Sequence, residues 1–133
     1  MYEDVLTFGG AGAYTYDPGS DGATYVNIDG VTVSPFVDQK GDATADYNVT
    51  VDAQTTTYAF AMRGDDLYLT FPEHTLFPYI DNDAFWAAPE FKVESITREN
   101  IELVHDNGSI AWHFLITSKA AAYVFKGFNY SAD

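Results

Sequence analysis

The sequence contains no cysteine, and basic residues are scarce. The first absence excludes disulfides, thiolate metal sites and cysteine nucleophiles. Six Lys and Arg stand against twenty Asp and Glu, so the formal net charge is -14. Such a chain would repel nucleic acid and anionic membrane surfaces, and we therefore expect neutral or cationic partners.

Long apolar runs and targeting patterns are also missing. No stretch approaches the roughly 18 consecutive apolar residues of a membrane span, so the sequence predicts no such segment. The first residues, Met1 to Val5, lack the basic and then apolar regions of a signal peptide. For an exported protein, we expect the signal to have been removed already.

Aromatic residues are abundant, with ten Tyr, ten Phe and two Trp among 133 residues. Aromatic and β-branched side chains suit a pleated, half-buried surface, which favours strands over helices. The length is that of one domain with its own core. Short apolar or alternating runs predict strands at residues 4–8, 12–16, 24–28, 31–34, 47–51, 56–63, 67–71, 91–97, 101–105, 110–117 and 123–128.

Turn residues between these runs predict direct hairpins. Asp29-Gly30 suits a type I′ turn, because that turn needs positive φ at both central residues. Gly64-Asp65-Asp66 and Asp106-Asn107-Gly108-Ser109 join further pairs of runs. The prediction is an all-β domain in which neighbouring strands form an antiparallel meander, closed as a barrel or packed as a β-sandwich.

Two stretches interrupt this rhythm. Residues 38–46 are polar and suit a surface loop, whereas residues 72–89 form a long segment that contains four large aromatic residues and three prolines. A loop of this length in a small domain is usually functional or disordered, and the aromatic content argues against disorder. No stretch predicts a confident helix.

Segments 14–17, 57–60, 66–69, 91–103, 106–108 and 111–114 share a recurring order of strands and turns. In this order the chain resembles the lipocalin-like β domains of surface glycan-utilisation lipoproteins from Bacteroidetes-type bacteria. The resemblance implies an extracellular or cell-surface location, glycan binding and neighbouring domains in a longer chain. It transfers no binding residue position by position, and no lipidation cysteine is present.

The segment from Phe77 to Trp86 combines aromatic rings with carboxylates and amides, the two kinds of group that hold a sugar. We expect Trp86 to be the stacking platform. The expected hydroxyl partners are Tyr79, Asp81, Asn82 and Asp83. In the alternative interpretation, Phe77, Phe85 and Trp86 fold inward and close one end of the barrel.

Other candidate sites have weaker support. The period of two places Trp112 on the same face as Ile110, Phe114 and Ile116, so we expect a core residue, with His113 on the opposite face. The acidic stretches 17–21 and 81–83 do not match an EF-hand, and the three histidines are too far apart to predict a zinc site. Neither a metal nor another cofactor is therefore predicted.

Motifs of catalysis are absent, since the sequence has no G-x-S-x-G, H-E-x-x-H or Gly-rich phosphate loop. Acid pairs arise by chance among twenty acids. Together with the aromatic and acidic segment, the resemblance therefore implies a noncatalytic carbohydrate-binding module of a bacterial cell-surface or secreted protein. Two alternatives stay open. One is a structural or interaction domain of a multi-domain protein, and the other is a lipocalin-like carrier of a small ligand, which requires a hollow interior.

Overall fold

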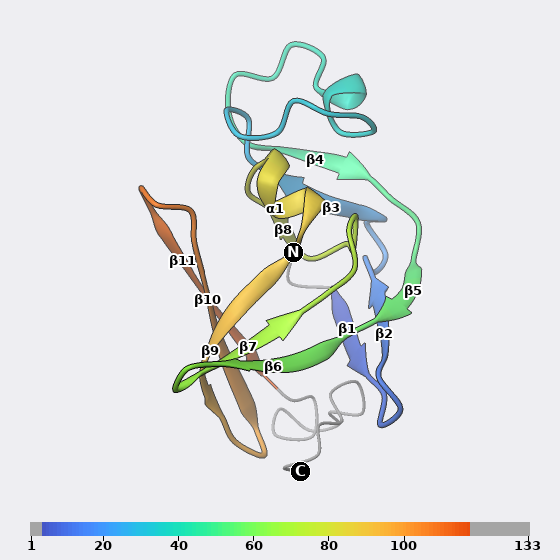
Figure 1. Ribbon diagram of the computed structural model, residues 1–133. Helices are drawn as coiled ribbons and strands as arrows, with labels where there is room; N and C mark the ends of the chain where they lie inside the picture. Colours follow the sequence, from blue (N-terminus) through green and yellow to red (C-terminus); the bar gives the residue numbers. More distant parts are fainter. Residues whose placement is uncertain (1–3, 118–133) are drawn as a thin grey trace.

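Strands dominate the computed structural model, which describes residues 4–117 (Figure 1). Within that range the strands form three sheets, and none of these sheets closes into a barrel. The pairings are antiparallel, with the exception of a short parallel pairing between β3 and β8. The predicted all-β, mainly antiparallel character is confirmed, and the simple meander is not.

The largest sheet has the order β11-β10-β9-β7-β6, and the two smaller sheets have the orders β1-β2-β5 and β4-β3-β8. In Figure 1 α1 lies beside β3 and β8. The elements are β1 (Val5–Phe8), β2 (Ala13–Asp17), β3 (Ala23–Val26), η1 (Val37–Gln39), β4 (Tyr47–Thr50), β5 (Gln54–Thr57), β6 (Ala59–Arg63), β7 (Asp66–Thr70), β8 (Tyr79–Ile80), α1 (Asp83–Ala87), β9 (Glu90–Ile96), β10 (Asn100–Asp106) and β11 (Ala111–Thr117).

The hairpin predicted at Asp29-Gly30 is wrong. Residues 31–34 form no strand, and β3 pairs instead with β4 and β8. Position 30 requires glycine because the backbone passes close to Asp81 there. A Cβ at this position would lie 2.1 Å from the carbonyl oxygen of Asp81. Its own carbonyl accepts a hydrogen bond of 3.0 Å from the backbone N–H of Asp83. A glycine without a side chain lets the chain pass against the start of α1.

The strand predicted at residues 56–63 is divided in two. β5 pairs with β2, and β6 pairs with β7, so the two halves belong to different sheets. Tyr58 lies at the break, where its N–H and hydroxyl donate to the carbonyls of Gly12 and Gly9 at 3.0 and 2.7 Å. The strand predicted at residues 123–128 lies outside the described residues.

The segment 72–89, expected as a loop, contains both β8 and α1. Asn82 is the N-cap of this short helix, and its side-chain oxygen accepts a hydrogen bond of 2.7 Å from the N–H of Phe85. Such a cap satisfies one of the N–H groups that a helix start leaves without an intrahelical partner.

In the described part of the chain, no helix is long and apolar enough to cross a membrane.

Aromatic side chains fill the space between the sheets. Tyr14 packs against Phe71 at a centroid distance of 4.7 Å, and Phe71 packs against Phe91 at 6.2 Å. Phe91 then contacts Phe77 at 4.5 Å, which contacts Phe114 at 5.2 Å. The rings connect the sheet of β1, β2 and β5 to the five-stranded sheet, and each fully buried ring contributes roughly 1.5–3 kcal/mol by burial.

Burial raises the pKa of several tyrosines above its ordinary value of 10.0, namely Tyr14, Tyr16, Tyr47, Tyr58 and Tyr79. These groups bind their protons more tightly in the folded chain, so the stability they contribute is complete below about pH 10 and is lost as the pH rises further. We expect the melting temperature to fall steeply above about pH 10. A Tyr16→Phe variant should show a shallower decline, and a melting temperature that is constant up to about pH 11 would contradict this prediction.

Candidate functional site

The carboxylate of Asp81 is the most densely bonded polar group of the interior. Asp81 follows β8 directly and is 2% exposed. Its Oδ1 accepts from Asn27 Nδ2 at 3.1 Å and from Trp112 Nε1 at 3.0 Å, and its Oδ2 lies near Asn82 Nδ2 at 3.2 Å, His105 Nε2 at 3.0 Å and Asn107 Nδ2 at 2.9 Å. We call this group the Asp81 cluster.

The Asp81 cluster joins parts of the chain that are distant in sequence. Asn27 follows β3, His105 belongs to β10 and Trp112 belongs to β11. A buried carboxylate is tolerated where hydrogen-bonding partners replace its water, and here the partners come from the end of β3 and from β10 and β11. The cluster therefore holds the five-stranded sheet against the sheet of β4, β3 and β8.

His105 and Asp81 form a pair that resembles the base and orienting acid of some hydrolytic sites. The ring of His105 also packs on Phe85 at 4.7 Å, and its side chain is 13% exposed. A depression of about 280 Å³ lies beside it, lined by Asn82, Ala84, Phe85, Ala88, Glu90, His105, Asp106 and Asn107. No serine, threonine or cysteine is among these lining residues, so the lining has no hydroxyl or thiol nucleophile for this pair to activate.

The expected hydroxyl partners of a sugar are occupied by internal contacts. Tyr79 is buried, and its hydroxyl donates to Asp46 Oδ2 at 3.1 Å. Asp83 accepts from the backbone N–H of Thr32 at 2.8 Å and from its hydroxyl at 2.5 Å. With Asp81 in its cluster and Asn82 capping α1, these four side chains position the segment and do not converge on one surface.

Trp86 is buried, with 8% of its surface exposed. Its ring stacks on the imidazole of His74 at a centroid distance of 4.9 Å and an angle of 16°, and it meets the ring of Phe36 edge-on at 4.7 Å. The expectation of an open Trp86 platform is therefore corrected. Phe77 and Phe85 are buried as well, at 2% and 3% exposure, so the aromatic part of the segment points inward.

Trp86 nevertheless borders an open groove of about 520 Å³. Its lining includes the stretch from the end of β4 to the start of β5, together with His74. We call it the Trp86 groove. Its lining residues are Pro35, Thr50, Val51, Asp52, Ala53, Gln54, His74, Leu76 and Trp86. Of the expected sugar-binding residues, Trp86 alone belongs to this set.

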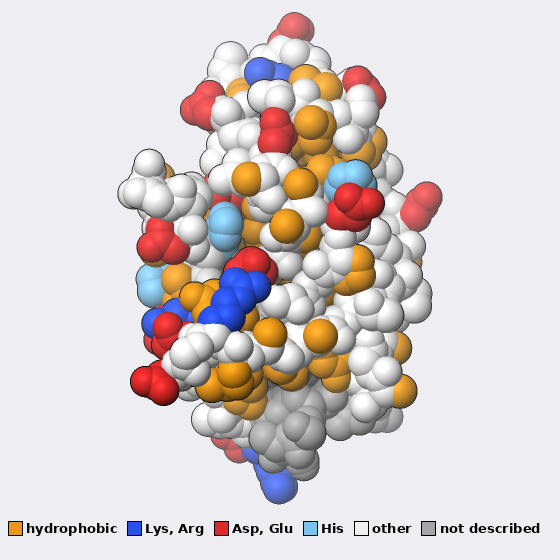
Figure 2. Space-filling view, viewed as in Figure 1, with side chains coloured by type: hydrophobic (Ala, Val, Ile, Leu, Met, Phe, Trp, Pro, Cys, Tyr) orange, Lys and Arg blue, Asp and Glu red, His pale blue; other side chains and the backbone are white. Residues whose placement is uncertain are grey.

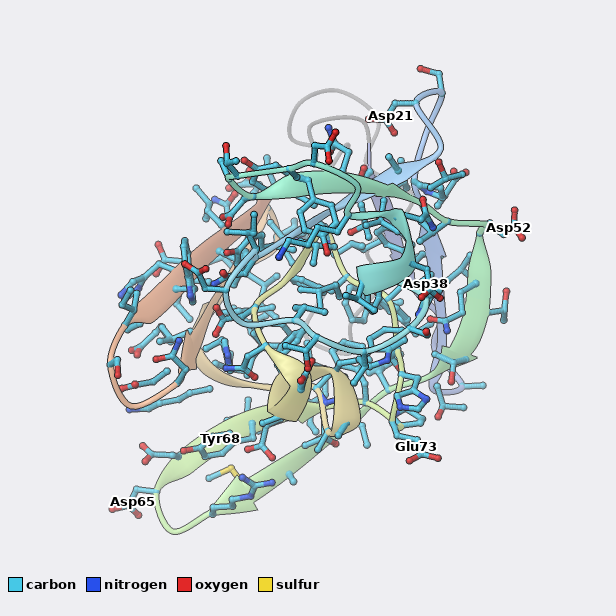
Figure 3. All side chains as sticks on the ribbon, turned by 90° about the horizontal axis from the view of Figure 1, so that it is seen from above. Asp21, Asp38, Asp52, Asp65, Tyr68 and Glu73 are labelled. Carbon is cyan, nitrogen blue, oxygen red and sulfur yellow. The ribbon has the colours of Figure 1, made fainter. Side chains whose placement is uncertain are left out.

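The surroundings of the groove are acidic. Asp52 lies in its lining, and Glu73 precedes His74 in the chain. Figure 3 shows Asp38, Asp52 and Glu73 on the same side of the molecule. On the face drawn in Figure 2, acidic side chains are spread widely, and hydrophobic side chains are exposed between them.

Trp112 occupies the inner side of β11, as the period of two predicts. It is partly buried together with Phe114 and Ile116, and His113 is exposed on the other face. Ile110 departs from the prediction, because it precedes the strand and is 54% exposed. Its N–H donates to the side chain of Asn107 at 2.8 Å, which keeps it in the turn.

Acidic residues considered for calcium serve other roles. Asp17 Oδ1 accepts from the N–H of Gly19 at 2.9 Å, and Asp21 Oδ1 accepts from the N–H of Ala23 at 3.0 Å. These contacts shape the turn between β2 and β3. Within residues 4–117, no group of three or more His, Cys, Asp or Glu side chains has an arrangement that could hold a metal ion.

Comparisons with family models, with curated proteins and with solved structures find no match for this chain. The site has to be interpreted from its own geometry. Sequence reasoning missed His74, Gln54 and Asp52 because each lies in an unremarkable local context, with neither a motif nor a telling period. The position of Trp112 in the Asp81 cluster agrees better with the sequence prediction, because alternation along the strand places its ring on the inner face.

Replacing Asp81 with Asn should destabilise the fold by about 2–4 kcal/mol, because the new amide group turns a donor toward neighbours that are themselves donors. Urea unfolding monitored by circular dichroism measures the loss. Asp65→Asn is the matched control, since it removes the same charge at an exposed position in the turn between β6 and β7. Equal midpoints for the two variants would contradict the structural role of the cluster.

Proposed function

We propose that this protein is a noncatalytic carbohydrate-binding module and that the Trp86 groove is its binding site. The observation that carries the proposal is the composition of the groove, in which an aromatic pair, apolar side chains and a few polar groups surround about 520 Å³ of open space. Pockets of roughly 300–1,000 Å³ with such a mixed lining are typical of small-molecule sites. A pyranose presents apolar faces to rings and hydroxyls to carboxylates and amides.

Charge supports a neutral ligand. The net charge of -14 and the carboxylate of Asp52 in the groove both disfavour an anionic compound. A neutral saccharide avoids this repulsion and uses Asp52 as a hydrogen-bond acceptor for its hydroxyls.

The groove also favours binding over catalysis. Hydrolysis of a glycosidic bond ordinarily uses two carboxyl groups that flank the scissile bond. Asp52 is the single acidic residue among the nine residues that line the groove. A bound saccharide would therefore be held without being cleaved.

The proposal extends to location. The resemblance to surface glycan-utilisation domains supports an extracellular or cell-surface protein in which this domain accompanies others. In that setting the three sheets represent an open, sandwich-like form of the lipocalin-like domain, with binding at a surface groove and not in a central cavity. The rings that fill the space between the sheets support this difference.

An interaction domain is the second candidate, and one observation favours it. Val33 and Val37 are 37% and 38% exposed, and both lie beside the groove residue Pro35 in the sequence. Exposed apolar side chains close to a groove suit contact with a neighbouring domain as well as with a sugar. A carrier of a small apolar ligand is less favoured, because buried rings occupy the interior that it would need.

Ala53 allows a direct test, because it lines the groove and is exposed. Ala53→Arg places a long side chain in the groove without altering the core. We expect the affinity for neutral oligosaccharides, measured by isothermal titration calorimetry on the best ligands of a glycan array, to fall at least about tenfold.

Ala111→Arg is the matched control, because Ala111 is exposed on β11 and lines neither depression. It should bind like the wild type. Absence of binding by the wild-type protein across a broad array of neutral glycans would refute the carbohydrate hypothesis and favour the interaction domain.

A further inference from the structure

His74 has a backbone conformation that is uncommon for a residue other than glycine. Its φ is +63°, and within residues 4–117 it is the one residue other than glycine with a positive φ. The left-handed region brings Cβ close to the backbone, so residues other than glycine are uncommon there, and Asn, Asp and His are the ones that occur most often. Residues held in such conformations are concentrated at binding sites, where surrounding contacts maintain them.

Contacts on both sides of His74 impose this conformation. Its N–H donates to the carbonyl of Trp86 at 2.8 Å, and its carbonyl accepts from Gln54 Nε2 at 2.9 Å. Gln54 is fixed in turn, because its Oε1 accepts from the N–H of Leu76 at 2.7 Å. Trp86, Gln54 and Leu76 all line the groove, so the elements that build the groove also hold His74 in place.

The imidazole of His74 is oriented by its stack on Trp86. The near-parallel rings, at 16°, leave one face of the imidazole covered by the indole. His74 as a whole is exposed and lines the groove. Because the indole covers one face of the imidazole, the opposite face is the one on which a ligand in the groove could stack. The indole of Trp86 contacts Phe36 edge-on and stacks on the imidazole of His74. Trp86 therefore supports the His74 ring from behind.

We propose that the outer face of His74, backed by Trp86, is the platform on which the Trp86 groove holds an uncharged saccharide unit. This inference rests on the proposed function and specifies the ligand-contacting residue and the class of ligand. A ring held flat against a larger ring loses little freedom on binding, which favours affinity. The imidazole nitrogens add a hydrogen-bonding edge for a hydroxyl group.

The acidic surroundings define the class of saccharide. Asp52 lines the groove, and Glu73 is exposed directly before His74. A carboxylate or sulfate on the ligand would face the like charge of Asp52, without a lysine or arginine among the lining residues to offset it. Neutral hexose oligosaccharides should therefore bind, and their uronate or sulfated analogues should bind at least about tenfold more weakly.

The test compares three substitutions at His74 by calorimetry, with the oligosaccharide that the wild type binds best. His74→Gly and His74→Asn remove the platform but suit the left-handed conformation, so their urea midpoints should be equal to or above that of the wild type, while affinity falls at least about tenfold. His74→Phe retains a flat ring and should recover most of the affinity.

The outcomes separate the two proposals. If the wild type binds no neutral saccharide, the proposed function and this inference both fail. If the wild type binds but His74→Gly binds equally well, the groove remains a saccharide site and the platform assignment is overturned. Acidic analogues that bind as tightly as neutral ones would overturn the assignment of ligand class.

Discussion

The requirement that a buried carboxylate must be surrounded by donors organises this structure. Asp81 lies where the chain passes between sheets, and its two oxygens cannot be left without partners in the interior. Asn27, His105 and Trp112 supply contacts from three different strands or strand ends. The orientation of β8 and the start of α1 follow from this arrangement, because both are continuous with Asp81 in the chain.

The placement of α1 explains why most residues that the sequence predicts as sugar-binding lie outside the lining of the Trp86 groove. Once Asn82 caps the helix, Phe85 and Trp86 face the interior and Ala84 and Ala87 face outward. The large rings thereby become part of the core, and the accessible aromatic surface passes to His74, which stacks on Trp86. In the proposed saccharide site, a residue from outside the aromatic run would thus be the contact surface of the groove.

Much of the strand content could be predicted, because alternation and composition act locally. The runs now seen as β1, β2, β4, β7, β9, β10 and β11 were recognisable from apolar spacing and turn residues. The hairpin prediction at Asp29-Gly30 was wrong because the pair suits a tight turn, whereas the glycine at position 30 lets the backbone pass close to the backbone of Asp81. The division between β5 and β6 could not be predicted from the sequence, because apolar and polar residues alternate in both halves. The two strands differ in their partners, since β5 pairs with β2 and β6 pairs with β7.

The sequence by itself determined an acidic, cysteine-free, aromatic-rich chain that favours strands, because propensity, charge and period depend on neighbouring residues alone. Tertiary structure decided which polar residues are buried and which ring is accessible. Asp81 meets Asn27 across 54 positions and Trp112 across 31, and His74 meets Gln54 across 20. Contacts of this span depend on how the sheets pack, and side-chain hydrogen bonding across them leaves no periodic trace in the sequence.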